Sequence, residues 1–229
     1  MKILIKIPVI FVCTFFISST SFAQVRLFHM EWDKGEIINN IELSTIKDFK
    51  HEKQFKPFRA KFVVNQSILK VISLLNDTGD TKFNPPGYES TKVLEKSVMR
   101  TVIHRMGSRN IPFKPRDFVV EFINHLDYGS RKLVLMMSST ENPMVPILSG
   151  HHRGVLIDGF IVARVIAKDK TEIEIGTLID LGGWMPRFIA KKLLKNDILN
   201  TAEALKNELE TKERVISPKL KLLGEKLLR

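Results

Sequence analysis

The pattern of apolar and polar residues is most informative between Thr171 and about Glu210. Residues Thr171–Asp180 alternate apolar and polar side chains, which predicts a half-buried strand. Gly182 and Gly183 interrupt this strand, and Pro186 stands where the first turn of a helix tolerates proline. Beyond Pro186 the apolar residues recur at helical spacing, which predicts a long amphipathic helix. They are Ile189, Leu193, Leu194, Ile198, Ala202, Leu205 and Leu209. A strand that leads directly into a long helix favours a helix laid across the open side of a curved sheet.

The rest of the chain predicts one short helix and a series of antiparallel strands. The helix is expected at Asn65–Leu75, with Asn65 as its N-cap. Apolar runs separated by turn residues predict the strands. These are Glu36–Ile46, Phe55–Val64, Ser90–Lys96, Ser97–Met106, Asp117–Leu126, Arg131–Ser138 and Gly154–Ala167. No internal repeat is visible, so we expect one α+β domain in which a sheet wraps around a helix.

The first residues have the composition of a signal peptide. Lys2 and Lys6 precede the apolar run Ile7–Ile17, which is too short to span a bilayer, and Ser21–Ala23 fits a cleavage site before Gln24. Removing these 23 residues from 229 leaves 206, and it also removes the single cysteine. We therefore predict an exported protein, periplasmic or secreted, that is stabilised by its core without disulfides.

Two expectations follow for the mature chain, which we divide into a domain at 24–212 and a basic tail at 213–229. The tail after Pro218 contains enough leucine for a short amphipathic helix, but we favour disorder at this terminus. The net charge of +11 falls to +9 once Lys2 and Lys6 are removed. This surplus permits a nucleic acid or an anionic membrane as a partner. Export and the scattered basic residues argue against nucleic acid, so we favour transient contact with an anionic membrane, with plain solubility as the alternative.

Three motifs are present in a fixed order. Pro115–Phe118 (PRDF) opens a strand after a loop, and Ser138–Pro143 runs on through Pro146 to Gly150–Arg153 (GHHR). Asp180–Pro186 (DLGGWMP) precedes the long helix. They resemble the PRDF/DRDF, S-x-x-H-P…P…G-x-x-R and D-x-x-G-W-x-P motifs of the START domain, the lipid-transfer module named after steroidogenic acute regulatory protein. The resemblance covers about residues 31–212.

The resemblance implies a helix-grip fold: a curved antiparallel sheet closed by the C-terminal helix around an elongated apolar cavity. It also implies that a monomer holds one lipid, a phospholipid, a sterol or a similar molecule, and carries it between membranes without a cofactor. Moving an acyl chain through water unaided would cost on the order of ten kcal/mol, at about 0.8 kcal/mol for each CH₂. Composition alone does not separate such a cavity from a packed core.

By the same resemblance, the loop Ser139–Gly150 and the start of the long helix would form a gate over the cavity. The loop is unusually apolar, which suits insertion into a bilayer. Its apolar residues include Met144, Val145, Ile147 and Leu148. We expect aspartate at Met144 and Leu148 to abolish membrane contact without unfolding the protein. The alternative is that the loop packs down on the helix.

Arg100, Val102 and His104 share one face of their predicted strand, and the resemblance places that face inward. Sterol-binding relatives carry an acidic residue near the position of Arg100 and a basic one near Phe122. This sequence departs from that pattern, so we expect a polar or anionic headgroup against Arg100. Arg100 at the sheet edge, paired with Glu95 or Glu121, and His104 as a core histidine are the alternatives. The remaining expected cavity and gate residues are Phe122, Met136, Arg153, Trp184, Met185, Phe188 and Ile189.

Signals for catalysis are weak, and we assign no catalytic residue and no metal. His151 and His152 are adjacent on a predicted strand and point to opposite faces, so they cannot chelate one ion together. A cyclase or hydrolase of helix-grip type would need Arg100, His104 and Glu121 to converge. A lipid sensor acting through a protein partner is the third possibility. Lipid transfer between vesicles would separate a carrier from a sensor, and turnover of a ligand would reveal an enzyme.

Overall fold

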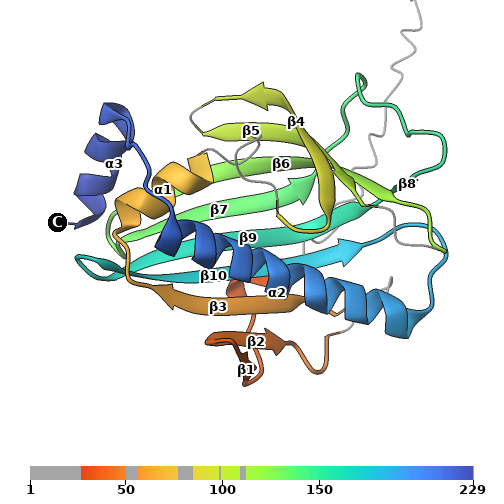
Figure 1. The fold of residues 1–229 in the computed structure, drawn as a ribbon, viewed down its shortest axis with the longest axis horizontal. Coiled ribbons are helices and arrows are strands. Elements are labelled where there is room, and N and C mark those ends of the chain that lie inside the picture. Colours follow the sequence, from red (N-terminus) through yellow and green to blue (C-terminus); the bar gives the residue numbers. More distant parts are fainter. Residues whose placement is uncertain (1–26, 50–55, 77–84, 98, 109–111, 229) are drawn as a thin grey trace, which may run out of the picture.

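The computed structural model describes residues 27–49, 56–76, 85–97, 99–108 and 112–228, and the predicted signal peptide lies outside them. Within these residues the chain forms one sheet and three α-helices (Figure 1). The elements are η1 (Leu27–His29), β1 (Glu36–Ile38), β2 (Ile41–Thr45), β3 (Phe58–Val64), α1 (Ile68–Asn76), β4 (Tyr88–Lys96), β5 (Arg100–Gly107), β6 (Arg116–Asp127), β7 (Lys132–Ser139), β8 (His152–Arg153), β9 (Val155–Ala167), β10 (Lys170–Asp180), α2 (Arg187–Thr211) and α3 (Pro218–Leu228).

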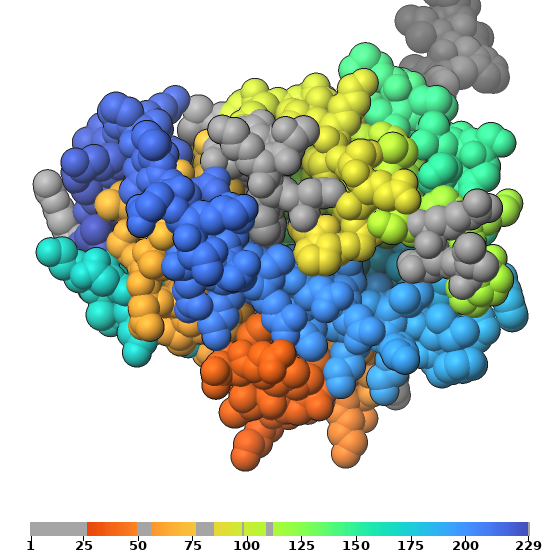
Figure 2. All heavy atoms as spheres, viewed as in Figure 1, coloured from red at the N-terminus to blue at the C-terminus, as the bar shows by residue number. Residues whose placement is uncertain are grey.

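The sheet has ten strands in the order β1-β2-β3-β10-β9-β7-β6-β5-β4, with every pair along this path antiparallel, while β8 adds a short parallel pairing to β6. The helix α2 runs across one face of the sheet, and α1 covers the same face beside it (Figures 1 and 2). We call this the inner face. Apolar residues on every second position of β3 pack there against α2: Phe58, Ala60, Phe62 and Val64 meet the layer of Ile198, Ala202 and Leu205. The predicted α+β class, with the long helix across a curved sheet, is confirmed.

The opposite, outer face is apolar as well, because further segments cover it. The N–H of Leu27 donates to Oδ2 of the buried Asp158 at 2.6 Å and fixes η1 against this face. Leu27 then packs with Val134, Phe160 and Leu178 in a second apolar cluster. The central strands are thus buried on both faces, so their sequences do not reveal which face is which.

The structure corrects three expectations about the elements. The predicted strand 36–46 is divided into β1 and β2 by Asn39 and Asn40, whose φ values of 51° and 61° make a tight turn. α1 begins at Ile68, not at Asn65, and the Ser67 carbonyl accepts the first helical hydrogen bonds. In addition to these corrections, the structure contains one short strand, β8, for which the sequence made no prediction.

The C-terminal tail is the third correction, because it forms the helix α3 and packs on α1 instead of being disordered. Leu227 is fully buried, and a Cβ at Gly224 would lie 2.2 Å from Cδ2 of Leu69. Nε of Arg131 donates to the carbonyl oxygen of Leu227 at 3.1 Å, which ties α3 to the β6–β7 hairpin. None of the helices described is both long enough and apolar enough to cross a membrane.

Candidate functional site

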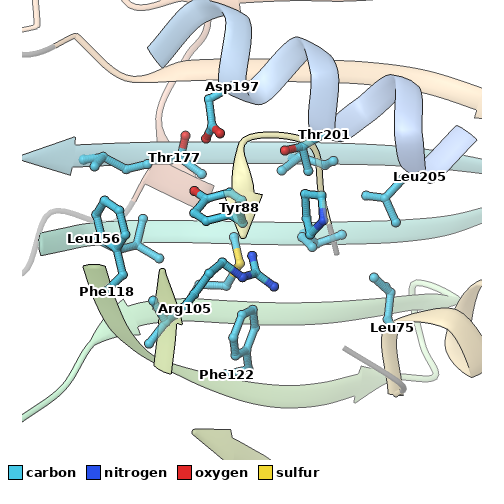
Figure 3. A pocket seen from close by; sticks show the side chains of 16 residues that line it. Leu75, Tyr88, Arg105, Phe118, Phe122, Leu156, Thr177, Asp197, Thr201 and Leu205 are labelled. Atoms are coloured by element: carbon cyan, nitrogen blue, oxygen red, sulfur yellow. The ribbon is translucent and has the colours of Figure 1, made fainter. Parts of the chain in front are cut away.

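The inner face of the sheet and α2 enclose an apolar pocket of about 100 Å³ (Figure 3). A second pocket, of about 260 Å³, adjoins it between the N-terminal half of α2 and the paired ends of β4 and β5. The two share Tyr88, Phe118, Ile179 and Asp197 in their walls, so they lie side by side. Together they reach the lower end of the few hundred Å³ that is typical of ligand sites. The apolar walls of the first pocket are built by Val120, Phe122, Met137, Leu156, Ile161 and Ile175.

A cluster of three polar side chains stands in this apolar wall, and we call it the polar cluster. It consists of Tyr88 from β4, Arg105 from β5 and Asp197 from α2 (Figure 3). The Tyr88 hydroxyl donates a hydrogen bond to the Asp197 carboxylate. The Arg105 guanidinium lies 4.9 Å from the centre of the Tyr88 ring, and its Nε donates to Oγ1 of Thr91 at 3.1 Å.

Burial is the largest influence on the pKa of each member of the polar cluster. It raises the pKa of Asp197 to about 6, although the charge of Arg105 and the hydrogen bond from Tyr88 act in the opposite direction. Burial and the neighbouring Asp197 also raise the pKa of the Tyr88 phenol, which therefore stays protonated and donates. Burial lowers the pKa of Arg105 without removing its charge. The pocket thus presents a fixed cation, a titratable carboxylate and a phenol.

The predicted cavity residues divide between the two faces of the sheet. Phe122 lies on the inner face and lines the first pocket. Val102, by contrast, lies on the outer face with Val119 and Val145, so its predicted place in the cavity is wrong. Met136 also packs on the outer face, and its neighbour Met137 lines the pocket instead.

Arg100 and His104 share this error. Arg100 lies at the exposed end of β5 in ion pairs with Glu95 and Glu121, as in the alternative considered above, and it does not reach the pocket. His104 points to the outer face and contacts Asp117. A shift of one residue along a strand exchanges its two faces, and both faces of β5 carry apolar residues. Among the described residues, the basic side chains that do line the two pockets are Arg105 in the first pocket and Arg116 in the second.

The three motifs of the START resemblance meet at one corner of the fold. Nε of Arg116 donates to the carbonyl oxygen of Leu181 at 3.3 Å, so the first motif holds the turn before α2. The fully buried Asp117 accepts from Nε of Arg153 at 3.0 Å, and Nε2 of His104 lies 2.9 Å from the same oxygen. Burial alone would raise the pKa of Asp117, but the hydrogen bonds and charges of Arg153 and His104 outweigh it and lower that pKa. Arg153 is thus a structural anchor on the outer face.

Arg153 also holds the segment 140–151, because its NH2 group donates to the carbonyl oxygens of Val145 and Pro146, both at 3.2 Å. Val145 is buried, whereas Met144 and Ile147 are 75% and 69% exposed. Leu148 is only half-buried, so Ile147 and not Leu148 is the exposed partner of Met144. This part of the expected gate is anchored at its centre and apolar on its surface.

The turn between β10 and α2 lies at the same end of the molecule (Figure 1). Trp184 is 80% exposed and Phe188 is 75% exposed. Met185 and Ile189 are half-buried, and Met185 lines the second pocket. The turn packs against β8, since a Cβ at Gly182 would lie 2.5 Å from the carbonyl oxygen of Arg153. Of the expected gate residues, Met144, Ile147, Trp184 and Phe188 are therefore exposed, and Met185 borders the second pocket. We call these four residues the exposed apolar end.

Comparisons with known proteins are consistent with this fold. No protein-family model matches the sequence, and no curated protein matches it. Among solved structures, the STAR-related lipid transfer protein from Xanthomonas axonopodis is 16% identical, with a TM-score of 0.66 over 78% of this chain and 98% of that chain. Human StAR-related lipid transfer protein 5 is also 16% identical, with a TM-score of 0.64 over 78% of this chain and 86% of that one. The lipid transfer and protein localization domain of human StarD13 is 19% identical, with a TM-score of 0.64 over 80% and 90%. The chain thus has the helix-grip fold of START domains, as the sequence motifs predicted.

Sequence reasoning missed the polar cluster, although α2 contained a signal for it. Asp197 stands one helical turn after Leu193 and one before Thr201, on the stripe that continues to Leu205 and faces the sheet. A carboxylate on the apolar side of a helix is unusual and marks a candidate site. Tyr88 and Arg105 carried no such signal.

Proposed function

We propose that the protein binds a single hydrophobic lipid between the sheet and α2 and carries it between membranes. The observation that carries this proposal is an apolar pocket with a charged, hydrogen-bonding cluster in its wall. Such a combination suits a molecule with a long apolar part and one polar end. The cation of Arg105 would receive an acceptor or anionic group of the ligand, and the walls of the pocket would take its chain out of water.

The size of the hollow bears on how a lipid enters. The first pocket, at about 100 Å³, is smaller than the ligand sites of typical proteins. A whole lipid therefore needs α2 or its neighbours to move outward, which would also open the second pocket as a mouth. In this proposal the polar cluster lies near that mouth, because Tyr88 and Asp197 line both pockets.

The exposed apolar end supports contact with a membrane during loading and release. Trp184 and Phe188 are the kind of side chain that settles at the level of lipid headgroups. Arg187, Lys191 and Lys192 are exposed beside them. Each such cation gains about 1 kcal/mol near an anionic membrane surface. If the export predicted from residues 1–23 holds, the membranes served lie outside the cytoplasm.

The carrier proposal is tested with mature protein purified from its own host. Native mass spectrometry followed by lipid extraction should show one co-purifying lipid per chain. Thr201→Phe places a ring in the pocket from α2 and should lower both lipid occupancy and transfer of fluorescent lipid between vesicles, whereas Glu210→Phe on the exposed side of α2 should not. An empty protein that takes up neither fluorescent phospholipid nor sterol would contradict the proposal.

The membrane contact needs a separate test, because binding and transfer can fail independently. The double variant Trp184→Asp and Phe188→Asp should bind lipid normally and lose co-sedimentation with vesicles that contain anionic lipid. Ile37→Asp, at an equally exposed position on β1, is the matched control. If the double variant transferred lipid at the wild-type rate, this end of the molecule would not be the membrane contact.

A catalytic role is the second candidate, and the polar cluster is the observation that favours it. A carboxylate whose pKa is raised to about 6, beside a phenol and a guanidinium, has the properties of a general acid–base group. The set considered from sequence, Arg100, His104 and Glu121, faces away from the pocket and does not serve this purpose. Incubation of protein with its extracted lipid, followed by mass analysis of that lipid, decides the matter: a changed mass that disappears in Asp197→Asn identifies an enzyme.

A further inference from the structure

We propose that the hydrophobic site extends beyond the first pocket. The far end of the ligand's acyl chain would lie in a separate apolar pocket beneath α3, which is distinct from the second pocket described above. This inference rests on the proposed function and names the part of the molecule that measures chain length. The distal chamber, as we call it, is a pocket of about 290 Å³ between α1, α3 and the β6–β7 hairpin. Its apolar lining includes Ile72, Leu75, Leu126, Leu133, Leu220 and Leu223.

The distal chamber and the first pocket are separated by very little protein. A void of about 10 Å³ lies between them and is lined by Leu75 and Phe122, which also line the first pocket. Leu75, Asn76 and Asn124 line both this void and the distal chamber. The side chains of Leu75 and Phe122, together with the polar Asn76, Thr101 and Asn124, therefore form the constriction. In this proposal a change of rotamer at Leu75 and Phe122 joins the two spaces.

The polarity of the hollow gives the ligand a direction. The polar cluster stands where the first two pockets meet, and Figure 3 shows Leu75 to one side of it, with Leu156 and Phe118 on the other side. A ligand whose polar end contacts Arg105 thus directs its chain toward Leu75. Because the first pocket is small, a long chain has to continue past the constriction, and the apolar distal chamber is the space beyond it.

The helix α3 forms the cover of the distal chamber and is held firmly. Gly224 allows α3 to lie directly on Leu69 of α1, and Arg131 binds the carbonyl oxygens of Leu227 and Leu228. These contacts fix the apolar side of α3 above the chamber, so the space has a defined length. We infer that the distal chamber sets an upper limit on the chain that the protein accommodates.

The test measures the affinity of lipid-free protein for octanoate, decanoate, laurate, palmitate and stearate by titration calorimetry. In the wild type each added CH₂ should tighten binding about fourfold, as burial of one methylene predicts. In Leu223→Trp, which fills the distal chamber, this gain should stop at an intermediate length while octanoate binds as before. Leu75→Trp closes the constriction and should stop the gain earlier. Leu222→Trp, at a position that is 61% exposed on the same helix, should behave as the wild type.

The outcomes separate the two proposals. If wild-type protein binds no fatty acid of any length, the distal chamber is refuted as an acyl-chain site, and the proposed function fails with it only if fluorescent phospholipid and sterol are not taken up either. If affinity rises with length equally in the wild type, Leu223→Trp and Leu75→Trp, the protein binds lipid but the distal chamber does not hold the chain. Leu75→Trp keeps the test decisive if Leu223→Trp does not fold.

Discussion

The change Asp197→Asn should make the ligand-free protein relatively more stable at neutral pH than at acidic pH. Burial raises the pKa of Asp197 to about 6 from an ordinary 3.8, so the folded protein holds this proton more tightly than the unfolded chain does. Ionising Asp197 therefore costs about 3 kcal/mol more in the folded state. Asparagine has nearly the same shape, still accepts the hydrogen bond from Tyr88, and never ionises.

The sign of the pH dependence follows from proton binding. Between about pH 4 and about pH 6 the folded state holds a proton that the unfolded state has released, so stability falls as the pH rises. Below this window both states are protonated, and above it both are ionised. From about pH 4.5 to about pH 7.5, Asp197 alone should remove about 2 kcal/mol of the wild-type free energy of unfolding. The corresponding change in Tm is about 4–8 °C for a chain of this size.

The assay is urea denaturation of lipid-free wild type and Asp197→Asn at these two pH values. Asp197 attracts Arg105 only when its carboxylate is ionised, and this attraction is already included in the pKa of about 6. The change with pH of the stability difference between the two proteins is therefore the informative quantity. That difference should shift by about 2 kcal/mol in favour of the variant at the higher pH. Identical pH profiles for the two proteins would refute the reasoning and show that Asp197 is in ordinary contact with solvent.

Three further changes test other parts of the structure. Arg153→Met leaves the buried Asp117 with His104 as its remaining partner, and should cost about 3 kcal/mol of unfolding free energy and speed hydrogen exchange at the Val145 amide. Gly224→Leu forces α3 away from Leu69 and should cost about 1–3 kcal/mol, seen as a lower urea midpoint and faster proteolysis between α2 and α3; an unchanged midpoint would mean that α3 is not packed as described. Arg100→Gln should leave lipid uptake unchanged, because the guanidinium lies at the exposed end of β5 in ion pairs with Glu95 and Glu121, and reduced uptake would return Arg100 to the ligand site.

The sequence was most informative where local chemistry decides the structure. The strand β10, the turn at Gly182–Gly183 and the helix α2 follow from alternation, from two consecutive glycines and from helical spacing, all of which are visible within a short window. The structure gives both glycines a positive φ. The three motifs were sufficient for the fold, and the structure explains why they occur together. Arg116, Asp117 and Arg153 connect them at one corner through direct hydrogen bonds.

The site was harder to predict because its members are brought together by tertiary structure. The faces of β5 and β7 could not be told apart in the sequence, since η1 and the segment 140–151 bury the outer face that would otherwise be polar. Tyr88, Arg105 and Asp197 come from three separate elements, and only strand pairing and the position of α2 bring them together. The helix α3 depends in the same way on its contacts with α1 and with Arg131.

The close packing of the Gly182–Gly183 turn has a kinetic consequence. Both glycines have positive φ, of 62° and 64°, and neither has room for a Cβ, because one lies against the Arg153 carbonyl and the other against the His152 ring. The start of α2 and the anchor of the segment 140–151 are therefore in rigid contact through β8. If α2 swings outward, the Gly182–Gly183 turn has to separate from β8. This movement would disturb Arg153 and, through Arg153, the segment 140–151. A fluorophore on α2 and another near Met144 should then report one shared relaxation rate instead of two independent ones.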